Sequence, residues 1–155
     1  MNNENKNPAD EASHNPTATA QPEAFDLADT EDVSEAEVQL KRNGAPIPVW
    51  VTMAGPEHPK RKAFAYSKQR KMRKQLAKTG KVEFNDPTED ESEEIDLLGT
   101  CLMGWRGVVF SGVTLDCTKD NIAKLLSDPK RAWFRRSVRE AFDDGEVFIK
   151  SSANN

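Results

Sequence analysis

Apolar residues are sparse near the N-terminus of the chain and dense in its last third. Between these regions, Val38 and Leu40 alternate with polar neighbours, and a second apolar run follows a few residues later. Asn43 and Gly44 lie between the two runs, and an Asn-Gly pair is a strong signal for a tight turn between antiparallel strands. The pattern therefore predicts a β-hairpin over residues 38–55.

The next stretch has the features of a helix over residues 58–79. Pro59 suits the first turn, and no proline or glycine follows until Gly80, which suits a C-terminal stop. The apolar positions form a narrow stripe, and lysines and arginines occupy the rest of the circumference. We therefore expect this helix to lie on the surface and to contact the core only along the stripe. The stripe consists of Phe64, Ala65, Met72 and Leu76.

A second helix is predicted over residues 93–105, after an acidic linker at 82–92. Apolar side chains recur along it with helical spacing, which places them on one face. Acidic residues at its start suit the positive end of the helix dipole. We expect this helix to form the centre of the core, with Leu98 as its anchor. The apolar face consists of Ile95, Leu97, Leu98, Cys101, Leu102 and Trp105.

The remaining C-terminal part alternates turns with two further helices. Residues 106–117 contain two glycines among apolar residues, which predicts a turn with short extended pieces. Thr118 suits the N-cap of a short helix at 119–126. Asp128, which precedes a proline, suits the start of a fourth helix at 129–144.

The first 37 residues hold ten acidic residues, one lysine and few apolar side chains. Such a segment buries too little surface to offset an ordering cost of about 1–2 kcal/mol per residue, so we expect it to be disordered and dispensable for folding. The sequence thus predicts a mainly α-helical protein: a small helical domain with an N-terminal β-hairpin and a disordered acidic tail. The expected segments are the tail at 1–37, a hairpin plus basic helix at 38–81, an acidic linker at 82–92 and a helical core module at 93–150.

Charge is arranged in blocks, although the net charge of the 155 residues is only −4. Residues 57–81 hold ten basic residues and one acidic residue, whereas residues 83–96 hold eight acidic residues and no basic ones. Three interpretations of the basic helix stay open: a solvated face or one bridged to the acidic linker, a surface for an acidic partner protein, or a surface for a phosphate backbone. Lys71, Arg73 and Lys74 are its candidate partner-binding residues.

The sequence contains no motif for catalysis, a metal or a cofactor. Cys101 and Cys117 predict two reduced, partly buried thiols, because neither has a partner cysteine or histidine at the spacing of a zinc site. The glycines form no phosphate-binding loop. We therefore expect a protein that is not an enzyme and binds no metal or cofactor. No apolar run reaches the ~18 residues of a membrane span and no signal peptide is evident, which predicts a cytosolic protein without membrane contact.

An ordered series of residues in the C-terminal half resembles the small tail assembly chaperones of long-tailed (siphovirus-like) bacteriophages. In that family a helix ends in a tryptophan, a glycine-containing turn and a short helix follow, and the last helix leads to a terminal phenylalanine. The upstream strand pair, Gly-Pro and basic helix are also similar, so the resemblance covers residues 38–150, without the acidic tail. The series is Ile95-Asp96-Leu97-Leu98, Cys101, Gly104-Trp105, Ser111-Gly112-Val113, Cys117-Thr118, Asn121-Ile122, Leu125-Leu126, Trp133, Val138, Ala141-Phe142-Asp143-Asp144 and Phe148.

The resemblance implies a chaperone that binds and solubilises the long helical tape-measure protein during tail assembly, with tail-tube subunits as further partners. It implies action in the cytoplasm of the infected bacterial host and absence from the mature virion. The candidate apolar contact residues are Trp105, Phe110, Trp133 and Phe134, each of which also fits the core.

Two alternatives from other classes stay open: a small basic-helix nucleic-acid-binding protein, and a structural virion subunit of the tail or of head completion. The chain offers no groove-reading motif, which favours a protein partner over nucleic acid. The oligomeric state, a homo-oligomer included, is left open by the sequence.

Overall fold

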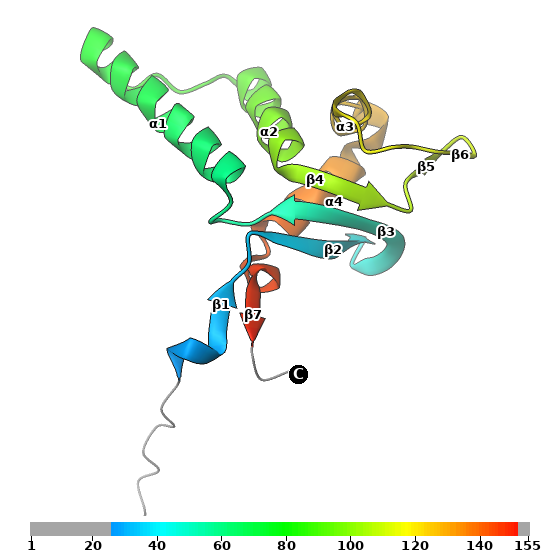
Figure 1. The fold of residues 1–155 in the computed structure, drawn as a ribbon. Coiled ribbons are helices and arrows are strands. Elements are labelled where there is room, and N and C mark those ends of the chain that lie inside the picture. The colour runs from blue at the N-terminus through cyan, green and yellow to red at the C-terminus, as the bar shows by residue number, and fades with distance from the viewer. Residues whose placement is uncertain (1–25, 152–155) are drawn as a thin grey trace, which may run out of the picture.

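The computed structural model describes residues 26–151, so most of the expected N-terminal tail lies outside the described residues. Of the described residues, 53% are helical and 26% form strands. The prediction of a mainly α-helical protein is therefore wrong. The described part of the chain combines four α-helices with three small antiparallel sheets (Figure 1).

The largest sheet has three strands in the order β2-β3-β4. The predicted hairpin is confirmed as β2 and β3, joined by Asn43 and Gly44 with φ of 52° and 79°. Pro46 and Pro48 lie inside β3. This stretch of β3 precedes the residues that pair with β4, so the missing N–H groups fall where the strand has only one neighbour. The strands are β2 (Glu35–Arg42), β3 (Ala45–Ala54) and β4 (Leu102–Arg106).

Strand β4 replaces the last turn of the helix predicted over residues 93–105. That helix ends at Cys101, and Leu102 leaves it in an extended conformation with φ −81° and ψ 102°. Trp105 then lies opposite Val51 of β3. A short apolar run fits both a helix and a strand, and periodicity alone does not separate the two. Pairing with β3, a contact that is distant in sequence, decides in favour of the strand.

A second sheet of two strands joins the two ends of the described chain. Next to it, the backbone N–H of Val33 donates to the carbonyl oxygen of Phe148 at 2.8 Å. The prediction of a disordered segment at 1–37 is therefore wrong for residues 26–37: β1 pairs with the C-terminal strand, and residues 35–37 belong to β2, which pairs with β3. The strands are β1 (Thr30–Asp32) and β7 (Ile149–Ser151), and a short 3-10 turn, η1 (Leu27–Asp29), precedes them.

The basic helix is confirmed as α1 (Pro59–Thr79), and Gly80 ends it in the left-handed conformation with φ 69°. The predicted acidic linker at 82–92 is wrong in its second half, because α2 (Pro87–Cys101) starts inside it. The cause is a capping box at Asp86. Its carboxylate accepts from the backbone N–H groups of Thr88 and Glu89, while the Glu89 carboxylate accepts from the N–H of Asp86.

The C-terminal elements follow the predicted order. Thr118 caps the short helix through its hydroxyl, which accepts from the N–H of Asn121 at 3.2 Å. The fourth helix is preceded by a 3-10 turn, and a small hairpin forms the extended pieces after β4. The elements are β5 (Val109–Phe110), β6 (Val113–Thr114), α3 (Lys119–Leu126), η2 (Pro129–Arg131), α4 (Ala132–Asp143) and η3 (Gly145–Phe148).

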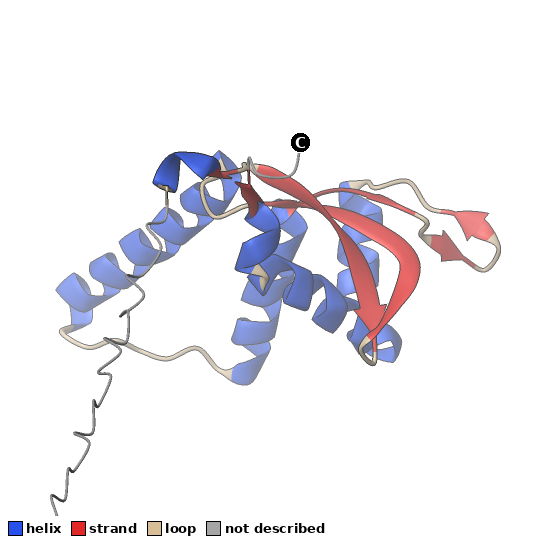
Figure 2. Cartoon of the chain, turned by 90° about the horizontal axis from the view of Figure 1, so that it is seen from below, coloured by secondary structure: helices blue, strands red, loops and turns tan. Residues whose placement is uncertain are grey.

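The core lies between the three-stranded sheet and α4, which packs on β2 and β3, with α2 and α3 at its side. Leu98 is completely buried there, as predicted. Figures 1 and 2 show that α1 and the β5–β6 hairpin project from opposite sides of this body. The largest fully buried side chains are Phe148, Leu40, Met53, Leu98, Leu126, Val51 and Val138.

Candidate partner-binding surface

Three of the four predicted aromatic contact residues form one cluster at the edge of the core. The ring of Phe134 lies edge-to-face with Trp105 and with Trp133, at centroid distances of 6.5 and 5.9 Å. Phe134 is only 5% exposed, and the indole N–H of Trp105 donates to the carbonyl of Leu115 at 2.7 Å. These contacts give Phe134 and Trp105 a packing role; Phe134 offers a partner almost none of its ring, while Trp105 is partly buried.

Trp133 and Phe110 are each partly buried and lie beneath cations. The Arg42 guanidinium is 5.2 Å from the centre of the Trp133 ring, and the Arg131 guanidinium is 4.5 Å from that of Phe110. Beside Phe110, Val109 and Val113 are 59% and 63% exposed on the projecting hairpin. Phe110 itself lies on β5 of this hairpin and packs against the core, and it is not part of the edge-to-face cluster.

The predicted basic contact residues Lys71, Arg73 and Lys74 are all exposed on α1. No residue of α1 is buried. The helix therefore contacts the body less than its apolar stripe predicted: Met72 and Leu76 are 45% and 47% exposed instead of touching the core. The stripe prediction is wrong for these two, because α1 diverges from the body after its first turns (Figure 1).

The base of α1 is held by Arg61. Its guanidinium lies 3.6 Å from the centre of the Phe142 ring and donates to the carbonyls of Phe142 and Ala54, at 3.2 and 3.4 Å. Burial lowers the pKa of Arg61, with Cys101 and Asp143 acting in the opposite direction. The carbonyl of Phe142 belongs to the last turn of α4, where a cation is favourable. One side chain thereby ties the projecting helix to the core.

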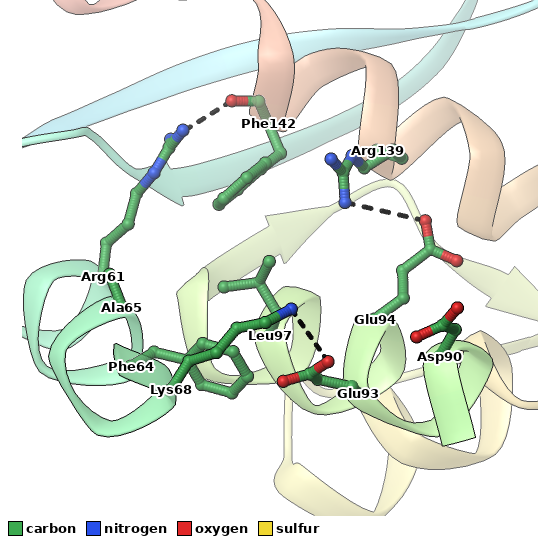
Figure 3. A pocket seen from close by; sticks show the side chains of 10 residues that line it. All are labelled: Arg61, Phe64, Ala65, Lys68, Asp90, Glu93, Glu94, Leu97, Arg139 and Phe142. Atoms are coloured by element: carbon green, nitrogen blue, oxygen red, sulfur yellow. Dashed lines mark hydrogen bonds and ion pairs between the residues drawn. The ribbon is translucent and has the colours of Figure 1, made fainter. Parts of the chain in front are cut away.

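Two adjoining cavities lie between α1 and α2. The inner one has a volume of about 320 Å³ and is lined by Phe64 and Leu97 (Figure 3). The outer one, about 260 Å³, is lined by Met72 and by the loop that joins the helices. Both cavities share Lys68, Asp90 and Glu93 as lining residues. We call the two cavities together the α1–α2 trough.

One ion pair crosses the trough. The ammonium of Lys68 lies 2.9 Å from a carboxylate oxygen of Glu93, so the two helices are linked near the middle of their contact (Figure 3). Lys68 and Glu93 are the only residues that pair α1 with α2 through charge in the described chain. The basic helix is therefore bridged to the acidic segment by one ion pair, and most of its other cations are exposed to solvent.

The outer part of the trough carries apolar side chains that sequence reasoning did not single out. Phe84 is 94% exposed and Val82 is 42% exposed, and both line the outer cavity with Met72. Their sequence signal was available: two large apolar residues stand in a segment that is otherwise acidic and polar. An exposed phenylalanine beside exposed aliphatic residues is typical of an interaction surface.

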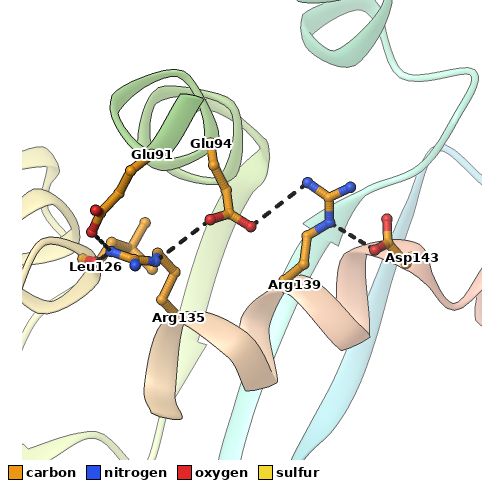
Figure 4. A network of polar contacts seen from close by, with 6 residues as sticks. All are labelled: Glu91, Glu94, Leu126, Arg135, Arg139 and Asp143. Atoms are coloured by element: carbon orange, nitrogen blue, oxygen red, sulfur yellow. Dashed lines mark hydrogen bonds and ion pairs between the residues drawn. The ribbon is translucent and has the colours of Figure 1, made fainter. Parts of the chain in front are cut away.

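The acidic residues of α2 are largely committed to contacts within the chain. Arg135 of α4 lies 2.7 Å from Glu91 and 3.6 Å from Glu94, and Arg139 lies 3.8 Å from Glu94 (Figure 4). Asp86 and Glu89 form the capping box. Only two acidic side chains of this helix, Asp90 and Asp96, lack a hydrogen bond or ion pair with another described residue.

The basic residues beyond Lys68, in contrast, are not paired with acidic residues of the described chain. Residues 68–81 carry seven lysines and arginines and no acidic residue. Among the described residues, six of these cations have no ion-pair partner: Arg70, Lys71, Arg73, Lys74, Lys78 and Lys81. The charge left unpaired on α1 and the start of the following loop is therefore positive, and Lys71 brings it into the lining of the trough.

No protein-family model, curated protein or solved structure matches the chain. Between residues 26 and 151, no cluster of three or more histidine, cysteine or carboxylate side chains could hold a metal ion. Within the same range, no helix is both long enough and apolar enough to cross a membrane. Both cysteines are free thiols in the described structure, with Cys101 buried and Cys117 half-buried.

Proposed function

We propose that this protein is a tail assembly chaperone of a long-tailed bacteriophage, which binds the tape-measure protein and keeps it soluble while the tail is built. The observation that carries the proposal is α1: a projecting helix without a buried residue, which combines unpaired cations with exposed apolar side chains. The ordered resemblance of residues 38–150 to the chaperone family is the reason for proposing the tape-measure protein as the partner. In this role the protein acts by binding and is not an enzyme.

The physical reason is the nature of a tape-measure protein. A very long helical chain exposes apolar stripes until tail-tube subunits cover them, and such stripes cause aggregation. A small protein that presents a charged, partly apolar helical surface can cover a stripe reversibly, because much of its contact energy is electrostatic and salt-dependent. The chaperone then leaves when tube subunits gather, so it acts in the cytoplasm of the infected host and is missing from the mature virion.

The test is co-expression of this chain with the tape-measure protein of the same phage. We expect the tape-measure protein to change from insoluble to soluble when the chain is present, and the two to co-purify. An unrelated acidic protein of similar size is the control for a general effect of expression. Mass spectrometry of purified particles should find the chain absent. Stoichiometric abundance in particles would instead identify a structural virion subunit and end the chaperone proposal.

The unpaired cations of α1 also support a second candidate function, binding to a nucleic acid backbone. This candidate predicts that the protein shifts duplex DNA at low salt and retains part of that affinity at physiological salt. Asp90, which is left unpaired on α2, would repel phosphates on one side of the trough. We therefore expect at most weak, salt-sensitive binding to DNA without sequence preference.

A further inference from the structure

We infer that the α1–α2 trough is a docking site for an amphipathic α-helix whose apolar stripe is flanked by acidic residues. The inference rests on the proposed function only for the source of this helix, a segment of the tape-measure protein. The chemistry of the occupant is argued from the trough itself, from its apolar lining and from the sign of its unpaired charge.

The apolar side chains of the trough lie in two adjoining cavities, an arrangement that suits the apolar stripe of a docked helix. Phe64 and Leu97 line the inner cavity, while Met72, Val82 and Phe84 line the outer one. With 21 residues, α1 is about 30 Å long, which is enough to lie beside five turns of a second helix. A docked helix presents side chains at i, i+3, i+4 and i+7, and such spacing can fill two adjoining cavities in succession.

The charge selects an acidic occupant. Beyond Lys68, α1 and the start of its C-terminal loop hold six cations without an ion-pair partner in the described chain, one of which, Lys71, lines the trough. The trough leaves two carboxylates without an ion-pair partner, Asp90 and Glu83, and Glu83 accepts a hydrogen bond from Gln75. The positive charges therefore outnumber the negative ones. A helix with glutamates beside its apolar stripe would pair with these cations. A helix flanked by lysines would face like charges along α1 and would be disfavoured.

The same charges exclude a second copy of α1 as the occupant. Two α1 helices side by side would bring both sets of unpaired cations together. Nucleic acid fits the charge but only part of the lining. Phe84 offers a base a ring to stack on, whereas Leu97, Met72 and Val82 are aliphatic and would stay uncovered by a nucleic acid. An acid-flanked helix satisfies both the lining and the charge.

The experiment uses the full chain and two synthetic peptides of about 18 residues, or five helical turns. Both peptides carry the same leucine stripe, flanked in one by glutamates and in the other by lysines. Binding is measured by fluorescence anisotropy at low and high salt. We expect the glutamate peptide to bind at least about tenfold more tightly than the lysine peptide, and its affinity to fall as salt rises.

Substitutions at the trough then locate the site. Phe84→Gln and Met72→Gln should each weaken binding of the glutamate peptide by about tenfold, as for residues central to an interface. Both side chains are exposed, at 94% and 45%, so circular dichroism should show an unchanged fold. Val113→Gln is the matched control: Val113 is an apolar residue, 63% exposed, on the β5–β6 hairpin, and its substitution should leave affinity unchanged.

Three results would overturn the inference: equal affinity for the two peptides, unchanged binding by Phe84→Gln and Met72→Gln, or displacement of the glutamate peptide by duplex DNA at physiological salt. Failure of the inference can be told from failure of the proposed function. If the wild-type chain and both variants solubilise the tape-measure protein equally, the trough is not the docking site and the proposed chaperone function stands. If the glutamate peptide binds as expected but the wild-type chain does not make the tape-measure protein soluble, the docking site stands and the proposed chaperone function is wrong.

Discussion

At the scale of single residues, burial separates side chains that maintain the fold from those that are free to contact a partner. Leu98 is completely buried in the core, whereas Leu76 is 47% exposed on α1. Leu98→Ala should lower the free energy of unfolding by about 2–5 kcal/mol, because it removes apolar contacts and leaves a cavity. The same substitution at Leu76 should cost less than about 0.5 kcal/mol beyond helix propensity. Urea denaturation measures both, and equal losses would contradict the assigned positions.

The cysteines give a second prediction at this scale. Burial raises the pKa of the Cys101 thiol and, against a hydrogen bond from the backbone of Trp105, that of Cys117. A raised pKa means less thiolate at neutral pH, and the thiolate is the reactive form. Both thiols should therefore alkylate more slowly than free cysteine at neutral pH. Because Cys101 is completely buried, iodoacetamide should alkylate it only when the protein unfolds. Mass spectrometry after iodoacetamide treatment, with and without urea, tests this, and rapid labelling of native Cys101 would contradict it.

At the scale of elements, local sequence signals predicted the helices better than the strands. Pro59 and Gly80 mark the ends of α1, and Thr118 marks the start of α3, because each acts through its own backbone neighbours. Strand β4 could not be predicted in the same way, since its pairing partner lies about 50 residues earlier in the chain. The start of α2 could have been predicted from Asp86 and Glu89, which have the spacing of a capping box.

The element that binds a partner should be separable from the element that supports it. Reversing Lys71, Arg73 and Lys74 to glutamate should weaken binding of an acidic helix, and more strongly at low salt, because charges along α1 are poorly screened there. The fold should survive, because all three side chains are exposed. Lys130→Glu, an exposed change in η2, is the control. Unchanged affinity of the triple variant at low salt would show that α1 does not contribute charge to binding.

At the scale of the whole molecule, the sequence predicted the charge blocks but not which of them would form ion pairs in the folded protein. The acidic block is largely paired, through capping and through arginines of α4 that are far away in sequence, while the six cations of the basic block beyond Lys68 stay without ion-pair partners among the described residues. This asymmetry depends on α4 lying beside α2, and no local pattern encodes it. The aromatic contact residues were predicted from their size and position, yet Phe134 and Trp105 proved to have partners within the chain. The exposure of Phe84 was found in the structure, although its place in an acidic and polar segment could have pointed to it.

The joining of the two chain ends leads to a prediction about truncation. Deleting residues 1–37 removes β1 and the first residues of β2. It also removes the hydrogen bonds from Val33 N–H to the Phe148 carbonyl, at 2.8 Å, and from Gly55 N–H to the Ser34 carbonyl, at 2.7 Å. We expect this truncation to lower the melting temperature by more than about 5 °C, which corresponds to about 1 kcal/mol for a domain of this size.

Deleting residues 1–25 is the matched control, because it leaves every one of these contacts in place. The composition of that segment predicts almost no change in melting temperature, about 2 °C at most. Thermal unfolding followed by circular dichroism compares the two truncations with the full chain. If removal of 1–37 proved as harmless as removal of 1–25, the β1–β7 pairing would add nothing to stability. If removal of 1–25 alone destabilised the protein, that segment would contribute contacts its composition does not predict.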